Sequence, residues 1–362
     1  MGIKDLKKFL RENYGDVLKS VPLSNFKGKK IAIDVMAIFY PHWCVVQSHN
    51  VKKMGKDLIT EEFNLDNIRE GWMDLVWKSL KRILMEGLIP VMVFDGKADD
   101  AKSDTKDNRK KISDTAKESI EKLKKELREV PAELYTSTML EPLKKKYSSW
   151  KSIREEDVLA LMKFFEGLGL PVIVATREAE ELCSFLCINK IVSAVYSTDT
   201  DNLAHRCPVW IHDIESKDGV NYAEVIYYQD VIDSLGFTPI EFLDFCILCG
   251  CDYNKPIYKL GPITSYNLIK KYGKIESLQG IRTAEEIGQL NHIKCRELFS
   301  NKDDLKVPTL GLDIDKSCIQ TYSTSYLTPY KMEYILPEID QIYKTVNYEE
   351  VKISINLSGL KI

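Results

Sequence analysis

Asp199 and Asp201 stand two residues apart, just after an apolar run at residues 194–196. Such a run is typical of a buried strand, and in an extended chain residues two apart point to the same side. Both carboxylates can therefore converge on one point beyond the strand end, where two like charges need a counter-charge such as a cation. The structural alternative for one isolated pair is that Asp199 caps a following helix or turn.

Further acidic residues follow or interrupt other apolar runs. Runs at residues 31–40, 89–94 and 170–176 are typical of buried strands, and the run 245–251 ends directly before an aspartate. Any one of these acids can be a cap, but so many at one edge of a sheet are unfavourable without a bound cation. The candidate metal ligands are Asp34, Asp95, Glu178, Glu180, Asp199, Asp201 and Asp252.

The elements that must position these acids alternate between strand and helix. Helical periodicity covers residues 64–87 and 158–168, and the apolar runs fit strands that are buried on both faces. This alternation predicts an α/β fold, with a mainly parallel central sheet covered by helices. In that fold ligands bind beyond the carboxyl ends of the strands, where the acids are expected.

Carboxylates without histidine or thiolate form a hard, all-oxygen ligand set. Such a set favours Mg2+, with Mn2+ as a substitute, over zinc. The number of acids indicates two ions, and paired ions about 4 Å apart suit in-line attack of water on a phosphodiester. The chemistry that these residues predict is metal-dependent phosphodiester hydrolysis, with Asp34 and Asp199 among the catalytic residues.

A basic segment lies between the second and third expected strands. Residues 102–151 carry 14 Lys and Arg against 9 Asp and Glu, whereas the whole chain has a net charge of −3. The spacing of Lys102, Lys106 and Arg109 would place all three in one cationic stripe of a helix, directly after Asp95. This stripe suits a polyanion. The alternative is a solvated helical insertion with charged faces.

The stretch after Asp252 indicates a hairpin of helices. Residues 253–273 fit a helix, a tight turn at Gly261-Pro262 and a second helix. A turn of this type can present its amides and a helix N-terminus to a phosphate.

The composition is that of a globular protein, 44% hydrophobic and 29% charged over 362 residues. No apolar run approaches the ~18 residues that cross a membrane, and the first residues lack a secretion signal. Nine cysteines without regular spacing indicate reduced thiols and an intracellular location, in the cytoplasm or nucleus. Cys246, Cys249 and Cys251 lack a second ligand pair at zinc spacing and lie in an apolar run that suggests burial.

Taken in order, these motifs resemble the flap endonuclease and XPG family of structure-specific 5′ nucleases, over roughly the first 275 residues. The residues that carry the resemblance are Met1-Gly2-Ile3, Ile33-Asp34, Val93-Phe94-Asp95-Gly96-Lys97, Glu178-Ala179-Glu180, Ser197-Thr198-Asp199-Thr200-Asp201 and Leu248-Cys249-Gly250-Cys251-Asp252-Tyr253.

The resemblance also implies roles for residues outside the acidic set. Lys102 and Arg109 match the pair on the family's gateway helix that meets the scissile phosphate, and Tyr40 matches the aromatic residue on which a base stacks. Residues 110–156 match the cap and arch that a single strand threads. The candidate substrate-binding residues are Gly2, Tyr40, Lys106, Lys259 and Gly261.

Two departures from the family pattern bear on partners. Lys259 replaces the first Gly of the family's hairpin sequence, and Ile263-Thr264 replace its basic pair. No sliding-clamp motif and no basic tail stand near the end, which argues against recruitment by a sliding clamp. A monomer is expected. Compact members of this kind are similar to those of large DNA viruses, which adds a viral factory to the expected locations.

The sequence therefore predicts a Mg2+-dependent 5′ nuclease that acts on branched or nicked DNA in replication, repair or recombination. The expected organisation is a nuclease core at 1–240 with a helical arch at 102–156, a helix-hairpin-helix region at 241–290 and a C-terminal region at 291–362 that packs on the core. The alternatives are a 5′ exoribonuclease with a similar acidic core and a catalytically inactive junction-binding scaffold, against which the intact set of seven acids argues.

Overall fold

The computed structural model describes residues 2–96, 103–150, 152–300 and 329–345 of the chain. Lys102 and residues 346–362 lie outside the described part.

The described strands are β1 (Leu18–Pro22), β2 (Lys30–Asp34), β3 (Ile89–Phe94), β4 (Val172–Val174), β5 (Ala194–Tyr196), β6 (Val209–Lys217) and β7 (Val220–Tyr227). The described α-helices are α1 (Leu6–Asn13), α2 (Val35–Met54), α3 (Leu65–Met85), α4 (Ser103–Arg128), α5 (Ser137–Ser149), α6 (Glu155–Gly167), α7 (Ala179–Ile188), α8 (Asp201–Ala204), α9 (Tyr228–Leu235), α10 (Pro239–Cys249), α11 (Pro262–Tyr272), α12 (Ala284–Gln289), α13 (His292–Phe299) and α15 (Pro329–Thr345). Short 3-10 helices include η1 (Gly15–Val17), η3 (Gly55–Ile59) and η6 (Ile275–Leu278).

One seven-stranded sheet forms the centre of the molecule, in the order β1-β7-β6-β5-β2-β3-β4. Strands β6, β5, β2, β3 and β4 are parallel to one another, and β7 is antiparallel to both β6 and β1. The prediction of a mainly parallel sheet covered by helices is confirmed. From β2 the chain passes to β3 and β4 on one side and then to β5 on the other, so a topological switch point lies between β2 and β5.

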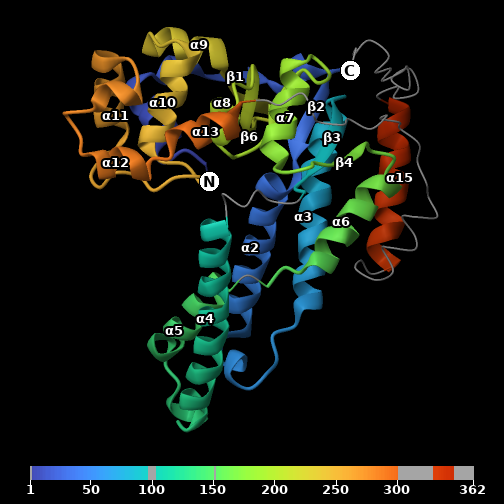
Figure 1. The fold of residues 1–362 in the computed structure, drawn as a ribbon. Coiled ribbons are helices and arrows are strands. Elements are labelled where there is room, and N and C mark those ends of the chain that lie inside the picture. Colours follow the sequence, from blue (N-terminus) through green and yellow to red (C-terminus); the bar gives the residue numbers. More distant parts are fainter. Residues whose placement is uncertain (1, 97–102, 151, 301–328, 346–362) are drawn as a thin grey trace.

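Each central strand is apolar on both faces because both faces are covered. Ala32, Val91 and Val195 belong to a core shared with α1, α7 and α9–α13. Ile33 and Met92, which alternate with them, belong to a second core shared with α2, α3, α6 and α15 (Figure 1). This alternation is the period of two that a strand imposes on its side chains.

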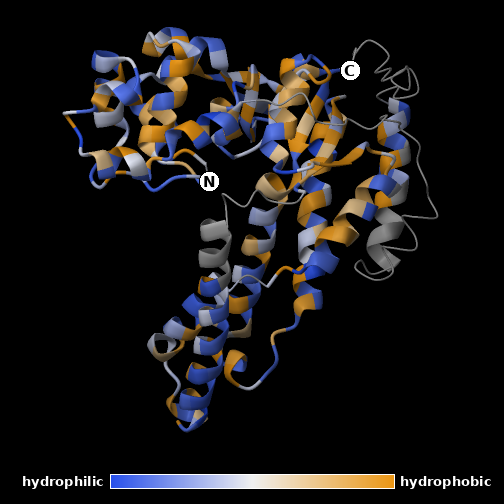
Figure 2. Ribbon diagram, viewed as in Figure 1, coloured by the Kyte–Doolittle hydropathy of each residue, from blue (hydrophilic) through white to orange (hydrophobic). Residues whose placement is uncertain are grey.

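A helical lobe extends away from the sheet and consists of α4 and α5 packed on the C-terminal half of α2 and on η3 (Figure 1). Its small core includes Val51, Ile120 and Leu143, whereas α4 is mainly hydrophilic (Figure 2). Lys124 Nζ donates to the carbonyl of Glu61 at 2.9 Å, which ties α4 to the chain after η3. The helical character predicted for the basic segment is confirmed.

The helix predicted directly after Asp252 is wrong. Residues 250–261 form an irregular connection between α10 and α11, and only the second helix of the predicted hairpin is present, as α11. Pro256 lies inside the segment, where a proline would remove a helical hydrogen bond. The helix that precedes α11 is α10, which ends at Cys249, before Asp252.

Candidate active site

The acidic residues lie at the carboxyl ends of the central strands, next to the switch point. Asp34 is the last residue of β2, and Asp95 directly follows β3. Glu178 and Glu180 stand at the start of α7 after β4, while Asp199 and Asp201 follow β5. Because the four strands are parallel neighbours, their ends bring residues that are far apart in the sequence to one edge of the sheet.

Two groups of carboxylates at this edge are close enough to hold a metal ion. Glu180, Asp199 and Asp201 form one group and Asp95, Glu178 and Glu180 the other, and within each group ligand oxygens lie within 4.8 Å of one another. Glu180 belongs to both groups. The side chains of the first group are buried, whereas in the second group Asp95 is exposed and Glu178 is half-buried, so solvent reaches the second group through Asp95. The predicted gathering of these acids at the sheet edge is present.

Asp34 lies beside both groups and is fixed by two hydrogen bonds. Its Oδ1 accepts from the amide of Ala37 at 3.1 Å, so it caps α2, and its Oδ2 accepts from Ser197 Oγ at 2.8 Å. Burial raises the pKa of Asp34 well above its ordinary value, and the charges of Asp95 and Glu180 raise it further. Both causes disfavour an anion here unless a positive charge is added.

This cluster fits a hard divalent cation. The ligand set is all oxygen, it carries several charges, and the buried members destabilise each other electrostatically, as the raised pKa of Asp34 records. A divalent ion reverses that penalty because it is the largest local charge in such a site. Carboxylates of this kind suit Mg2+ and Mn2+ better than softer metals.

Ser197 is a site residue that the sequence reasoning missed. Its hydroxyl donates to Asp34 and also accepts from the backbone amide of Asp199 at 3.1 Å. One side chain therefore joins the end of β2 to the acidic turn after β5. The sequence signal that could have identified Ser197 was a hydroxyl side chain between the apolar run 194–196 and Asp199.

Gly2 packs directly against the acidic turn after β5. A β-carbon added at Gly2 would collide with Asp199 Oδ1 and would lie 2.7 Å from Thr200 Oγ1, and the φ of Gly2 is +82°. Thr200 Oγ1 donates to the carbonyl of Ile3 at 3.2 Å, and the amide of Lys4 donates to the carbonyl of Gly250 at 2.9 Å. The residues next to Gly2 therefore link the acidic turn to the chain that precedes Asp252.

Gly96 allows the ends of β3 and β4 to approach each other. Its amide donates to the carbonyl of Arg177 at 2.7 Å, and an added β-carbon would collide with the carbonyl oxygen of Ala175. Asp95 Oδ1 in turn accepts from the amide of Ala179 at 3.0 Å, at the N-terminus of α7. This contact holds Asp95 beside Glu178 and Glu180.

Other predicted site residues lie around this cluster. Asp252 is half-buried in the connection after α10 and belongs to neither carboxylate group, so its role as a metal ligand stays a prediction. Tyr40 is half-buried on α2, and its backbone lies less than two turns from Asp34. Lys106 and Arg109 lie in the first turns of α4.

The hairpin residues Lys259 and Gly261 lie just before α11. Gly261 is the N-cap residue of that helix, and its carbonyl accepts from the amide of Ser265 at 2.9 Å. Lys259 is exposed and has a φ of +60°. This backbone conformation is more favourable for glycine, which the family's hairpin sequence has at this position. The ammonium of Lys259 lies 5.3 Å from the centroid of the Tyr258 ring.

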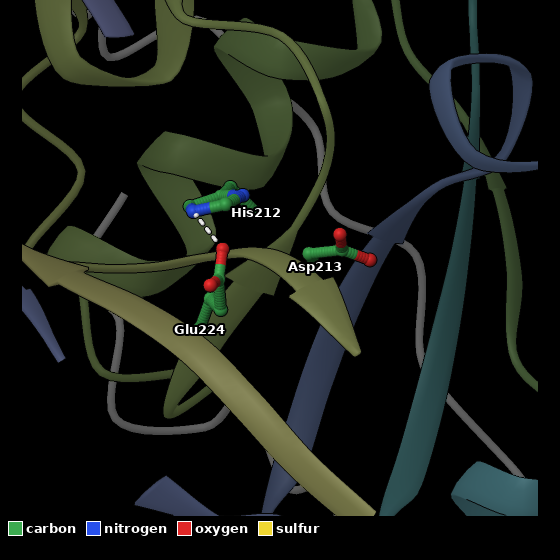
Figure 3. Close-up of side chains that lie close together, drawn as sticks. All are labelled: His212, Asp213 and Glu224. Atoms are coloured by element: carbon green, nitrogen blue, oxygen red, sulfur yellow. Dashed lines mark ion pairs between the residues drawn. The ribbon is translucent and has the colours of Figure 1, made fainter. Parts of the chain in front are cut away.

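A second cluster on β6 and β7 meets the distance requirement for a metal, but its histidine already contacts a lysine and a glutamate of the chain. In Figure 3 Glu224 points toward the buried His212, and Asp213 points away from the pair. Lys7 Nζ donates to Nδ1 of His212 at 2.8 Å, and Nε2 pairs with Glu224 at 2.9 Å. The hydrogen bond between Lys7 and His212 joins α1 to β6, so this cluster is a structural clamp between α1 and the sheet.

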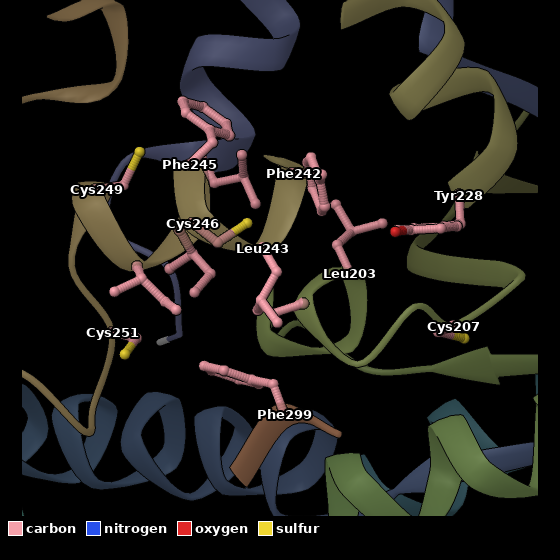
Figure 4. Packing of buried hydrophobic residues seen from close by; sticks show 14 of the residues in the cluster. Leu203, Cys207, Tyr228, Phe242, Leu243, Phe245, Cys246, Cys249, Cys251 and Phe299 are labelled. Atoms are coloured by element: carbon pink, nitrogen blue, oxygen red, sulfur yellow. The ribbon is translucent and has the colours of Figure 1, made fainter. Parts of the chain in front are cut away.

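The cysteines near the end of α10 lie within the apolar core. Figure 4 shows Cys246, Cys249 and Cys251 among Phe242, Phe245 and Phe299. Burial raises the pKa of the Cys246 thiol well above its ordinary value. The burial predicted for this run is confirmed.

The chain is similar in sequence to proteins of one known family. The chain matches the XPG N-terminal domain over residues 1–116 and the XPG I-region over residues 169–252. It is 32% identical over 278 residues to Flap endonuclease 1-2 of Paramecium tetraurelia, an alignment that covers 77% of this chain and 67% of the relative. It is 31% identical to Flap endonuclease 1 of Cryptosporidium muris, over 84% of this chain and 64% of that protein.

The fold is similar to that of solved nucleases. The catalytic core of Rad2 in complex with DNA substrate gives a TM-score of 0.63 at 15% identity, over 93% of this chain and all of that one. Flap endonuclease-1 from Methanococcus jannaschii gives 0.60 at 17% identity, over 93% of this chain and 99% of that one.

Buried carboxylates at the switch point of a parallel sheet fit a metal-dependent nuclease, and the family matches establish that class. The chain belongs to the XPG and flap endonuclease family, and it is a structure-specific 5′ nuclease, as the sequence predicted. Both relatives come from cellular organisms, so they do not support the expected viral origin. Within the described residues, no helix is long and apolar enough to span a membrane.

Proposed function

We propose that this protein hydrolyses a DNA phosphodiester near the junction between a single strand and a duplex, leaving a 5′-phosphate, and that two Mg2+ ions are its cofactors. The observation that carries this proposal is the pair of carboxylate groups that share Glu180 at the switch point of the sheet. Its substrates are flapped, nicked or otherwise branched DNA, in replication, repair or recombination.

The two groups divide the proposed metal ligands. Asp199 and Asp201 with Glu180 would hold one ion, and Asp95 and Glu178 with Glu180 the other, while Asp34 lies beside both groups. When bound, the ions supply an activated water and stabilise the charge on the attacking and leaving oxygens. Asp252 completes the proposed set from the connection after α10.

The chain's own residues orient this set. Ser197 holds Asp34 and the amide of Asp199 in one hydrogen-bonded arrangement, and Ala179 fixes Asp95. Because Asp34 and Asp95 are held by donors from other elements, these two carboxylates are oriented before substrate arrives, which lowers the reorganisation that the reaction requires.

The helical lobe gives the proposed path for the single strand. Helix α4 begins a few residues after Asp95 and carries Lys106 and Arg109 in its first turns, which favours a cationic approach to the scissile phosphate. Tyr40 on α2 is the proposed stacking partner of a base. Gly261 and Lys259 at the start of α11 are the proposed contacts to the duplex, because a helix N-terminus attracts phosphate.

The test is a panel of 5′-labelled flap, nicked, bubble and single-stranded DNA and RNA, with Mg2+ or with EDTA. We expect cleavage of junction DNA in Mg2+ and none in EDTA. Asp199→Asn should abolish cleavage but change junction binding by no more than a few-fold. The matched control is Asp16→Asn, at an exposed aspartate of η1, which should cleave normally.

Three outcomes would overturn the proposal. Preferential cleavage of RNA would indicate an exoribonuclease, and tight junction binding without cleavage in any metal would indicate a scaffold. Cleavage by Asp199→Asn above a tenth of the wild-type rate would remove the role of the acidic turn.

A further inference from the structure

Three glutamates stand at the N-terminus of α7, and one of them lies outside the candidate metal ligands. Glu178 is the N-cap residue and Glu180 lies in the first turn, and both form the second carboxylate group together with Asp95. Glu181 also lies in the first turn but belongs to neither carboxylate group, and its side chain is only 4% exposed. A buried carboxylate this close in the chain to two others is unfavourable unless a cation compensates its charge.

Arg177 supplies that cation. Its guanidinium forms an ion pair with the Glu181 carboxylate, four residues further along the chain. The pair therefore spans the segment that carries Glu178 and Glu180. Removal of one partner from a buried ion pair is strongly destabilising, because the other charge stays buried. Burial of Glu181, and with it the position of the first turn of α7, thus depends on Arg177.

The backbone of Arg177 joins the same turn to the end of β3. Its carbonyl accepts from the amide of Gly96 at 2.7 Å. Two residues further on, the amide of Ala179 donates to Asp95 Oδ1 at 3.0 Å. A side chain that follows β3 therefore caps α7, whereas the side chain of the N-cap residue Glu178 makes no capping hydrogen bond. Arg177 lies where the two elements that carry the second carboxylate group meet.

Helix α12 begins with the same Arg and Glu spacing but uses it differently. Arg282 pairs with Glu286 at 3.6 Å, and Glu286 also closes a capping box with the N-cap residue Thr283. Glu286 is 32% exposed, and such solvated pairs contribute little to stability. In α7 the corresponding glutamate is buried and the N-cap position holds a candidate metal ligand. The comparison indicates that the pair in α7 supports the ligand group as well as the helix.

We propose that Arg177 is a positioning residue for the second carboxylate group and acts through its ion pair with the buried Glu181. This inference rests on the proposed function. By compensating the charge of Glu181, Arg177 keeps the first turn of α7 against the end of β3, where Asp95, Glu178 and Glu180 converge. It acts on these ligands and does not contact the scissile phosphate.

The test measures Mn2+ binding by electron paramagnetic resonance, in the absence of DNA, together with unfolding by urea. The variants are Arg177→Met, Arg177→Lys and the double variant Arg177→Met with Glu181→Leu. The matched control is Arg282→Met, in the solvated pair of α12, which lies well apart from α7 (Figure 1). The direction of the change is informative, because removal of a positive charge would by itself strengthen the binding of a cation. Weaker binding therefore indicates displaced ligands.

We expect Arg177→Met to weaken binding of the second Mn2+ ion by about tenfold or more, because Glu181 loses its cation and the turn shifts. The first ion should change less, since Asp199 and Asp201 come from the turn after β5. Arg177→Lys should retain most of the affinity, because it keeps the charge but not the planar guanidinium. The double variant should bind both ions like wild type, since an apolar pair often replaces a buried ion pair without loss. Arg282→Met should bind both ions like wild type.

Unchanged or tighter binding of the second ion in Arg177→Met would overturn the proposal. A double variant that binds this ion as weakly as Arg177→Met would overturn it too, because the loss would then not arise from Glu181. If Arg177→Met does not fold, the double variant decides, and its failure to fold or to bind the second ion contradicts the proposal.

Failure of the proposed function would look different. Wild-type protein that binds no Mn2+ would overturn the proposed function and this inference with it. Wild-type protein that binds two ions and cleaves flap DNA, alongside an identical Arg177→Met variant, would overturn this inference alone.

Discussion

At the scale of single residues, the site depends on close approaches that only small or correctly placed side chains permit. Ser197 joins Asp34 to the acidic turn, and Gly2 fills the space beside Asp199. The acids themselves were identified from the sequence because each follows an apolar run. Ser197 was not identified, since its contact with Asp34 spans 163 positions of the chain, and Gly2 was predicted only as a substrate-binding residue.

We predict that Gly2→Ala reduces cleavage at least a hundredfold while the protein stays folded. The added methyl group would collide with Asp199 Oδ1, and the φ of +82° is unfavourable for alanine, so the turn that carries Asp199 and Asp201 must shift. Gly15→Ala is the control, because an added β-carbon there meets no atom within 4 Å. Wild-type cleavage rates in Gly2→Ala would show that this packing has no part in activity.

At the scale of elements, the sequence predicted the parallel strands better than the antiparallel ones. Residues 31–34, 89–94 and 194–196 were recognised as strands because burial on both faces makes them continuously apolar. The β6–β7 hairpin was missed, although Asp218-Gly219 in its turn, both with positive φ, is a hairpin signal. The helix expected after Asp252 was wrong because periodicity cannot distinguish an anchored loop from a short helix.

The clamp between α1 and β6 gives a prediction for the pH dependence of stability. Burial, followed by the charge of Lys7, lowers the pKa of His212 to about 4. The unfolded histidine has a pKa near 6.5, so between pH 6.5 and pH 4 the unfolded chain binds a proton that the folded chain does not. The free energy of unfolding should therefore fall as the pH decreases through this range.

Urea unfolding at pH 7.5, 6 and 5 measures this effect. The loss of stability on acidification should be smaller in His212→Gln than in wild type, and unchanged in the control His49→Gln, at an exposed histidine of α2. The charged groups around His212 are Lys7, Arg11, Asp213 and Glu224, and all are retained in both variants. If the free energy of unfolding depends on pH equally in wild type and His212→Gln, the clamp is refuted.

The helical lobe is attached to α2 by a buried polar network, which gives a second prediction at this scale. Gln47 Nε2 donates to the carbonyls of Tyr147 and Trp150 at 2.6 and 2.9 Å, and its Oε1 accepts from Ser152 Oγ at 2.6 Å. Gln47→Leu would remove the donor to the carbonyl of Trp150, at a cost of about 1–3 kcal/mol, whereas the carbonyl of Tyr147 would keep the amide of Trp150 as a donor at 3.3 Å.

We expect Gln47→Leu to loosen the connection after α5, so that limited proteolysis cuts residues 137–150 faster than in wild type. Asn50→Leu is the control, because Asn50 Nδ2 donates only within α2, to the carbonyl of Val46. Identical cleavage rates in Gln47→Leu and wild type would mean that packing of the lobe, without the network, holds its end in place.

At the scale of the whole molecule, the carboxylate cluster lies where separate parts of the chain meet. The N-terminal end of the chain lies beside the helices α10–α13 (Figure 1). Through Gly2 and Lys4 they contact both the acidic turn and the chain before Asp252. A substrate that engages the lobe with its single strand and α11 with its duplex would bring its junction to the cluster.

Glu180 provides the most direct test of the central claim, because it belongs to both carboxylate groups. The measurement is Mn2+ binding by electron paramagnetic resonance, together with single-turnover flap cleavage, in wild type, Glu180→Gln and the exposed control Glu12→Gln. We predict two bound ions and cleavage for wild type and Glu12→Gln, and the loss of both ions and of cleavage for Glu180→Gln. Wild-type Mn2+ affinity and cleavage in Glu180→Gln would contradict the account.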